Sequence, residues 1–101
     1  MRRWSRDGSL MASERVTWRP YDGPRQPESQ VPATAFAFPR ERKEPLFDAA
    51  HVRNALARFD QVSGVDDDER ALAFKNIKAA AAHFNVHVSE TSWHDLMRGS
   101  T

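Results

Sequence analysis

The fold is decided by residues 66–85, DDDERALAFKNIKAAAAHFN. Asp66 and Glu69 have the spacing of a capping box, in which each side chain accepts the backbone N–H of the other residue. The acidic residues after Asp66 also suit the positive end of a helix dipole. Apolar residues then recur at helical spacing, and Asn85 suits a left-handed cap. The pattern predicts a helix over residues 67–84 that buries Ala73, Phe74, Ile77, Ala80, Ala81 and Phe84.

An earlier helix is expected over residues 49–62, and a short later one over residues 90–98. Asp48 can accept the free N–H groups of the first turn, and Phe47 and Val52 have the spacing of a hydrophobic staple. Gly64 suits the left-handed residue that follows a helix. The sequence therefore predicts an all-α fold, a small three-helix domain over residues 35–101.

Residues 1–34 have a different character. All six prolines of the chain lie at or before Pro45. Apolar residues such as Trp4 and Trp18 are scattered here without a helical or strand period, so the segment cannot bury enough surface to offset the entropy of ordering. We expect a disordered N-terminal arm over residues 1–34. Residues 1–10 resemble read-in sequence, which makes Met11 an alternative translation start.

The segment Ala35-Phe36-Ala37-Phe38-Pro39 links the arm to the helices. Its alternation places both phenylalanines on one side of an extended chain. We expect the pentapeptide to lie across the helical domain and to enlarge its core. It is too short for an independent strand, and Pro39 would end any pairing.

Composition narrows the class of protein. The chain has no cysteine, which excludes disulfides and thiolate metal sites. No apolar run approaches the roughly 18 residues that span a bilayer. The formal net charge is +1, without the basic excess of a nucleic-acid module. We expect a cytoplasmic monomer that does not bind membranes.

Candidate chemistry is sparse. His83 and His87 have the spacing of two ligands on one helical face, but Asn85 is expected to end the helix between them, and the other residues of a zinc hydrolase are missing. The acidic run at 66–69 lacks the alternating ligands of an EF-hand. There is no glycine-rich phosphate loop, and so small a domain rarely encloses a pocket. We predict no catalytic residues, no metal, no cofactor and no enzymatic activity.

The best-organised polar feature lies on the helix over residues 49–62 and on the charged connector before it. His51, Asn54 and Arg58 flank the buried stripe of that helix. They could recognise a phosphate, a carboxylate or a partner helix, or simply form the solvated face of an amphipathic helix. The candidate interaction surface comprises Arg40, Arg42, Lys43, His51, Arg53, Asn54 and Arg58.

Residues 35–58, AFAFPRERKEPLFDAAHVRNALAR, resemble a family of small uncharacterised bacterial and phage-encoded domains. The family pattern is Phe-Ala-Phe/Leu-Pro, then a basic residue and Pro, then Asp-x-x-His-x-Arg-Asn-Ala-x-Ala-Arg. Phage relatives that occur beside head-maturation proteins imply an accessory interaction role. Where relatives carry a basic-aromatic-Pro-Ile segment, this chain has Lys43-Glu44-Pro45-Leu46. The matching residues are Phe36, Ala37, Phe38, Pro39, Pro45, Asp48, His51, Arg53, Asn54, Ala55, Ala57 and Arg58.

Together these observations predict a non-enzymatic interaction module. It would bind another protein through the helix over residues 49–62 and the extended segment before it. The alternative is a weak nucleic-acid-binding accessory protein, in which the contacts would come from Arg40, Arg42, Lys43, Arg53 and Arg58.

Overall fold

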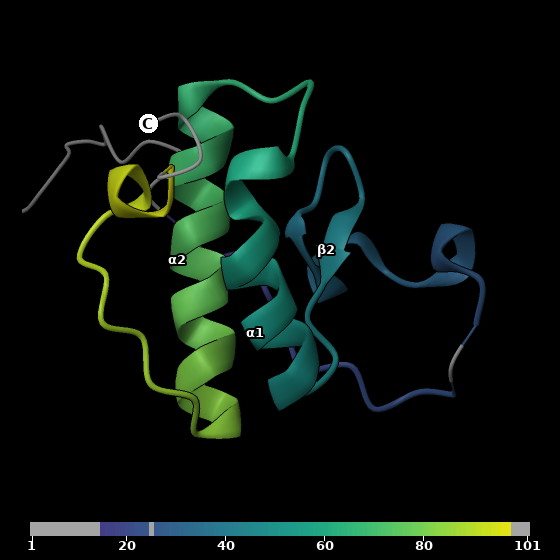
Figure 1. Ribbon diagram of the computed structural model, residues 1–101. Helices are drawn as coiled ribbons and strands as arrows, with labels where there is room; N and C mark the ends of the chain where they lie inside the picture. Colours follow the sequence, from purple (N-terminus) through teal and green to yellow (C-terminus); the bar gives the residue numbers. More distant parts are fainter. Residues whose placement is uncertain (1–14, 25, 98–101) are drawn as a thin grey trace, which may run out of the picture.

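The computed structural model describes residues 15–24 and 26–97 and has a mixed α/β fold (Figure 1). Helices α1 (Ala49–Arg58) and α2 (Asp67–Phe84) pack against each other and against an antiparallel hairpin of β1 (Phe36–Phe38) and β2 (Lys43–Pro45). In the hairpin, Phe36 pairs with Pro45 and Phe38 pairs with Lys43. α2 lies against β1 and α1 lies against β2.

The prediction of an all-α three-helix domain is therefore wrong. The extended Ala-Phe-Ala-Phe segment finds a hydrogen-bonding partner in residues 43–45, which overlap the stretch 40–44 that was expected to be a solvated connector. Phe36 and Phe38 are both buried, but in different clusters. Phe38 joins the main core, with its ring centroid 5.6 Å from that of Phe59, whereas Phe36 packs with Val31 and Ala35.

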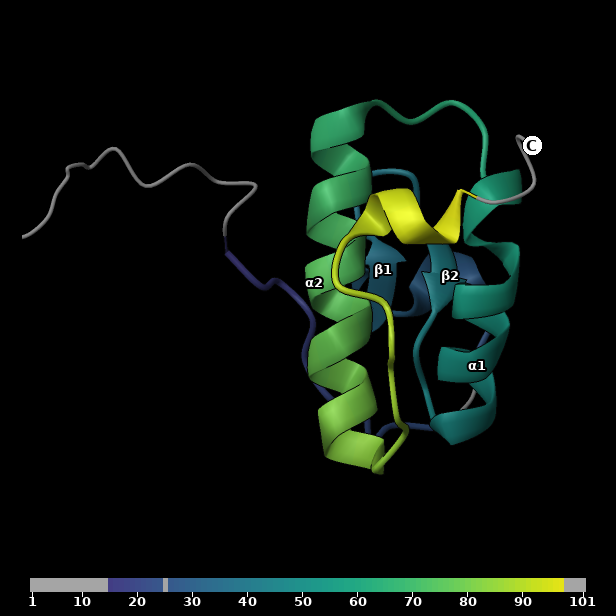
Figure 2. The same ribbon diagram turned by 60° about the vertical axis from the view of Figure 1, so that its left-hand side comes forward.

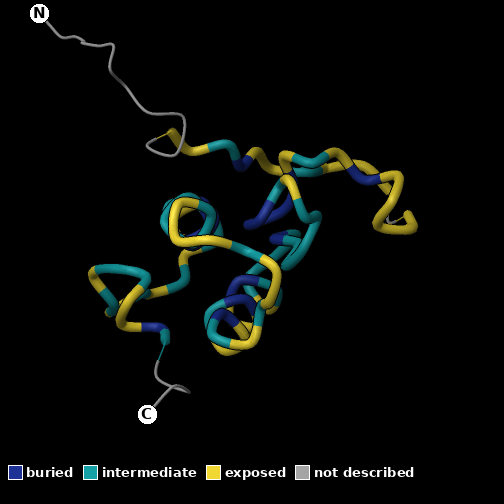
Figure 3. The backbone as a smooth tube through the Cα atoms, turned by 90° about the horizontal axis from the view of Figure 1, so that it is seen from above, coloured by how far each residue is buried: buried dark blue, intermediate teal, exposed yellow. Residues whose placement is uncertain are grey.

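The main core lies between the hairpin and the two helices. Seen from above, the buried positions gather where these elements face one another (Figure 3). Val52 and Ala55 come from α1, and Phe59 comes from the 3₁₀ turn η4 (Phe59–Gln61) that continues α1. α2 contributes Ala73, Phe74, Ile77, Ala80 and Ala81.

Both helices begin with a side-chain cap, and α2 also ends at a left-handed cap residue. The Asp48 carboxylate accepts the His51 N–H at 2.9 Å, and Asp66 and Glu69 form the reciprocal capping box. α2 spans the residues expected for it, and Asn85 follows it in the left-handed region with φ 65°. Among the described residues, no helix has the length and apolar composition needed to cross a lipid bilayer.

The helix expected over residues 90–98 is absent over 90–97, the part of that range that the structure describes. The chain runs back from the end of α2 to the 3₁₀ turn η5 (Trp93–Leu96) (Figure 2). The Asp95 carboxylate accepts the Thr91 and Ser92 N–H groups at 3.1 and 3.3 Å. The Ser92 bond belongs to a capping box between Ser92 and Asp95, which starts the turn after Ser92 and leaves residues 90–92 outside it.

The expected disorder over residues 1–34 is wrong for the described part of that range; residues 1–14, including Trp4 and Met11, lie outside the described residues. Trp18 is only 7% exposed and belongs to the main core. Its indole N–H donates to the Leu46 carbonyl at 3.2 Å, and the Arg19 N–H donates to the Thr34 carbonyl at 2.9 Å. Long-range contacts order this segment without any period in its sequence.

Asn76 joins the N-terminal segment, β1 and α2. Its side chain is fully buried. Its Oδ1 accepts the backbone N–H groups of Thr17 at 2.8 Å and of Trp18 at 3.0 Å. Its Nδ2 donates to Thr17 Oγ1 and to the Ala37 carbonyl, each at 2.9 Å. All the hydrogen-bonding capacity of the amide is thus directed at holding these segments together.

Replacing Asn76 by Leu should lower the free energy of unfolding by about 3 kcal/mol or more. The change leaves the Thr17 and Trp18 N–H groups and the Ala37 carbonyl buried without this partner, and each such group costs about 1–3 kcal/mol. Urea denaturation followed by tryptophan fluorescence would measure the loss. Asn54→Leu, at an exposed position of α1, is the matched control and should change stability by about 0.5 kcal/mol or less. Equal effects of the two variants would contradict the anchoring role of Asn76.

Candidate interaction surface

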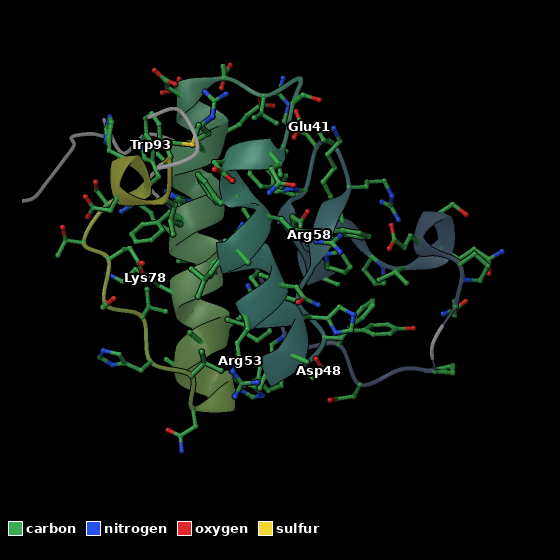
Figure 4. The ribbon with its side chains drawn as sticks, in the orientation of Figure 1. Glu41, Asp48, Arg53, Arg58, Lys78 and Trp93 are labelled. Atoms are coloured by element: carbon green, nitrogen blue, oxygen red, sulfur yellow. The ribbon has the colours of Figure 1, made fainter. Side chains whose placement is uncertain are left out.

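The seven residues of the expected interaction surface do not form one patch. Arg42, Lys43 and Arg58 line a shared hollow between β2 and α1. Arg53 lines a second hollow on another side of α1. Figure 4 shows Arg58 on the side of α1 that faces the hairpin and Arg53 nearer the end of α2. Arg40, His51 and Asn54 line neither hollow.

The first hollow, here called the β2–α1 hollow, has a volume of about 410 Å³. It is bounded by the hairpin, the end of α1, the turn after α1 and the rim residue Glu28. Its walls are mainly polar and charged. The lining residues are Glu28, Arg42, Lys43, Glu44, Pro45, Arg58, Gln61, Val62 and Ser63.

An unusual backbone shapes the hairpin wall of this hollow. In a regular strand, successive side chains point to opposite faces. Here Arg42, Lys43, Glu44 and Pro45 all line the same hollow. Arg42 and Glu44 adopt left-handed backbone angles, with φ 55° and 58°, which breaks the alternation. Such a conformation costs a non-glycine residue about 1 kcal/mol or more, and strain of this kind is concentrated at functional sites.

Two of the cations in the hollow are held by backbone carbonyls. Arg42 Nη2 donates to the carbonyls of Glu28, at 2.8 Å, and of Val31. Its guanidinium also lies over the Phe36 ring, 5.2 Å from the centroid. Lys43 Nζ donates to the Ser63 carbonyl at 2.9 Å. These two side chains are therefore held in place by uncharged backbone oxygens, while the Lys43 charge also acts on the nearby Glu44 carboxyl.

Glu44 is the half-buried carboxyl of the hollow. Burial raises its pKa above the ordinary value of 4.5, and the nearby positive charge of Arg58 partly opposes this shift. Within the described residues, the Arg58 guanidinium forms no hydrogen bond or ion pair. Nothing in the sequence marks Glu44 as a site residue, because a carboxyl in a polar connector is ordinarily solvated.

Arg40 has a structural contact elsewhere. It pairs with Glu69 at 3.7 Å, from the hairpin turn to the first turn of α2. Burial, and a hydrogen bond to Glu69, raise the pKa of the neighbouring Glu41 carboxyl above 4.5. These contacts tie the hairpin turn to α2 and engage the Arg40 charge.

His51 also has partners within the fold. Its Nδ1 lies 2.7 Å from Asp48 Oδ1, and its ring centroid lies 5.2 Å from that of Phe47. The Phe47 ring in turn contacts Tyr21 at 5.6 Å. His51 thus belongs to an aromatic cluster that closes the start of α1.

The second hollow lies between α1 and the chain that returns after α2. Its volume is about 300 Å³, and it is lined by Arg53, Leu56, Ala57, His87, Ser89, Glu90 and Leu96. His83 and His87, the spaced pair noted in the sequence, are separated by the end of α2 at Asn85. Over residues 15–24 and 26–97, no group of three His, Asp or Glu side chains could hold a metal ion.

Glu44→Gln should raise the melting temperature at pH 7 but leave it unchanged near pH 4. Because the folded state raises the pKa of Glu44, the folded protein binds this proton more tightly than the unfolded chain. The wild type therefore loses stability as the pH rises from about 4.5 through the folded pKa, and the variant escapes this loss. Thermal melts at a series of pH values would measure the difference. Asp22→Asn, in an exposed loop, is the charge-matched control. A Glu44→Gln advantage that did not grow with pH would contradict the effect of burial on Glu44.

A comparison with protein families agrees with the resemblance drawn from residues 35–58. A family of unknown function (DUF6582) matches residues 11–91. No curated protein and no solved structure matches the chain. The prediction of a family without an assigned function is confirmed, whereas the bacterial or phage origin stays a prediction. Since the match covers most of the chain, this protein belongs to the DUF6582 family of unknown function.

Proposed function

We propose that this chain is a non-enzymatic module that binds an acidic segment of another protein through the exposed side of α1. The observation that supports this most directly is the composition of that side. Its residues, called the α1 face below, are all exposed, and none is acidic. They are Ala50, Arg53, Asn54, Ala57 and Arg58.

Charge favours an acidic partner. α1 contains two arginines and no Asp or Glu, although the whole chain carries fourteen acidic residues. Arg53 and Arg58 lie at the two edges of the α1 face, one beside each hollow. Complementary charges at the rim of an interface speed association and select the partner.

The shape of the α1 face also favours a protein partner. Between the two arginines lie the short side chains of Ala50, Asn54 and Ala57, over which a partner backbone can approach closely. The half-buried Leu56 adds apolar surface next to the second hollow. The cores of interfaces are depleted in charged residues and are surrounded by a polar rim, in which Arg53 and Arg58 would lie. We expect the module to act as a cytoplasmic monomer without a cofactor.

The alternative of nucleic-acid binding has weaker support. It would use Arg40, Arg42 and Lys43 as well as the arginines of α1. Arg40 pairs with Glu69, and the charged groups of Arg42 and Lys43 donate to backbone carbonyls. Glu44 also lies beside Arg58 in the hollow. The five basic residues thus lie apart, around two hollows and at the hairpin turn, and do not form the continuous basic face that nucleic-acid modules present.

The proposal is tested by reversing the charge of the α1 face. The wild type and the Arg53→Glu/Arg58→Glu variant would each be immobilised and used to capture proteins from the source cell. A protein retained by the wild type would then be purified and its Kd measured. We expect the variant to bind that protein about tenfold or more weakly, because like charges then oppose each other at the rim.

The control variant is Arg19→Glu/Lys78→Glu, which reverses two exposed charges outside the α1 face. It should bind like the wild type. An equal loss in both variants would contradict a specific role of α1. Binding of mixed-sequence DNA that falls steeply between about 50 and 200 mM salt, and that needs Arg53 and Arg58, would favour the nucleic-acid alternative instead.

A further inference from the structure

We propose that the β2–α1 hollow is the anchoring pocket for an aspartate or glutamate side chain of the acidic partner, whose carboxylate is bound by Lys43 and Arg58 with Arg42 behind them. This inference rests on the proposed function and adds to it the chemical group recognised and the place where it binds. It also extends the site beyond the α1 face to the hairpin.

Three cations from separate parts of the chain line the hollow. Arg42 comes from the hairpin turn, Lys43 from β2 and Arg58 from the last position of α1. Lys43 Nζ carries three N–H donors, of which one is engaged by Ser63. The Arg58 guanidinium, without a hydrogen bond inside the described residues, offers a planar pair of donors that matches a carboxylate.

The site is already organised before a ligand arrives. Arg42 and Lys43 are held by the carbonyls of Glu28, Val31 and Ser63. Little freedom of these two side chains is therefore left for a ligand to remove, and preorganisation of this kind favours binding. Arg42 and Glu44, the two left-handed residues of the hairpin, both line this hollow. At about 410 Å³ the hollow is large enough for a carboxylate side chain and its hydrating water.

Glu44 is the group that opposes such a ligand. Its half-buried carboxyl lies in the same hollow and competes for Arg58. The three cations outnumber the two carboxyl groups of the lining, Glu44 and the exposed Glu28. Removing the Glu44 charge should therefore tighten the binding of an incoming carboxylate, while removing the Arg58 charge should weaken it.

The probe is a hexaglutamate peptide, with hexaglutamine as its neutral counterpart. Each would be titrated into the full-length protein at pH 7 and constant salt, and NMR would follow the backbone and the arginine Nε–Hε signals. We expect hexaglutamate to shift the signals of Lys43 and Arg58 and hexaglutamine to leave them in place. Arg58→Gln should raise the Kd by about threefold or more, and Glu44→Gln should lower it by a similar factor. Lys78→Gln, an equal loss of charge at an exposed position of α2, should leave the Kd unchanged.

A gain of affinity in Glu44→Gln cannot result from unfolding. A lower Kd in this variant together with a higher Kd in Arg58→Gln would therefore identify the hollow as the place where hexaglutamate binds. The inference is overturned if Lys78→Gln weakens binding as much as Arg58→Gln, or if Glu44→Gln does not tighten it. It is also overturned if inorganic phosphate at equal charge concentration shifts the same signals as strongly, because the hollow would then be a general anion site.

The two proposals can fail separately. If partner binding depends on the α1 face but hexaglutamate does not shift the signals of the hollow, only this inference is contradicted. Hexaglutamate in the hollow, with partner binding that needs Arg58 but is unaffected by Arg53→Glu, would contradict the proposed α1 interface alone.

Discussion

The buried amide of Asn76 is the constraint on which the arrangement of the other elements depends. It accepts two backbone N–H groups of the N-terminal segment and donates to the Ala37 carbonyl of β1. An amide in an apolar core is stable only when its donors and acceptors are satisfied, so α2, β1 and residues 17–18 must meet in one geometry. Trp18 is thereby placed in the core, where its indole N–H donates to the carbonyl of Leu46. That bond connects the N-terminal segment to the chain just after β2.

The two strands of the hairpin consequently have different tasks. β1 is buried along its whole length, and α2 and Asn76 hold it from one side. β2 is half-buried and lies at the surface beside α1. The fixed strand can support an unfavourable backbone in its neighbour, because the pairing of Phe36 with Pro45 and of Phe38 with Lys43 sets the register. The strained residues Arg42 and Glu44 are thus tolerated where they border the hollow and the solvent, and the core is left unstrained.

The features that the sequence predicted well are local. Asp48, Asp66 and Asn85 act on neighbouring backbone groups, and their caps could be read from spacing alone. The features that it missed join residues far apart: Asn76 binds Thr17 across 59 positions, and no period of apolar residues marks either one. The prediction of a third helix was wrong for a different reason. The Asp95 carboxylate accepts the backbone N–H groups of Thr91 and Ser92, and these bonds form a single turn. The hairpin was missed because its second strand is polar and contains Pro45, which is unusual for a strand. Two short extended runs separated by a turn were the signal that could have predicted it.

The same distinction explains the candidate site. Helical spacing grouped His51, Asn54 and Arg58 beside the buried stripe of one helix, but it could not show that Arg58 shares a hollow with Arg42 and Lys43. That juxtaposition requires β2 to pair with β1 and α1 to lie against β2, and both depend on tertiary contacts. Arg40, close in sequence to Arg42, is directed instead to Glu69. Proximity in sequence is therefore a poor guide to which cations line the same hollow. The grouping depends on the backbone conformation of the hairpin, where Arg42 and Glu44 are left-handed, and a list of charged residues does not show that conformation. Backbone conformation and the packing of α1 against β2 thus determine which positive charges share the hollow and which are paired elsewhere.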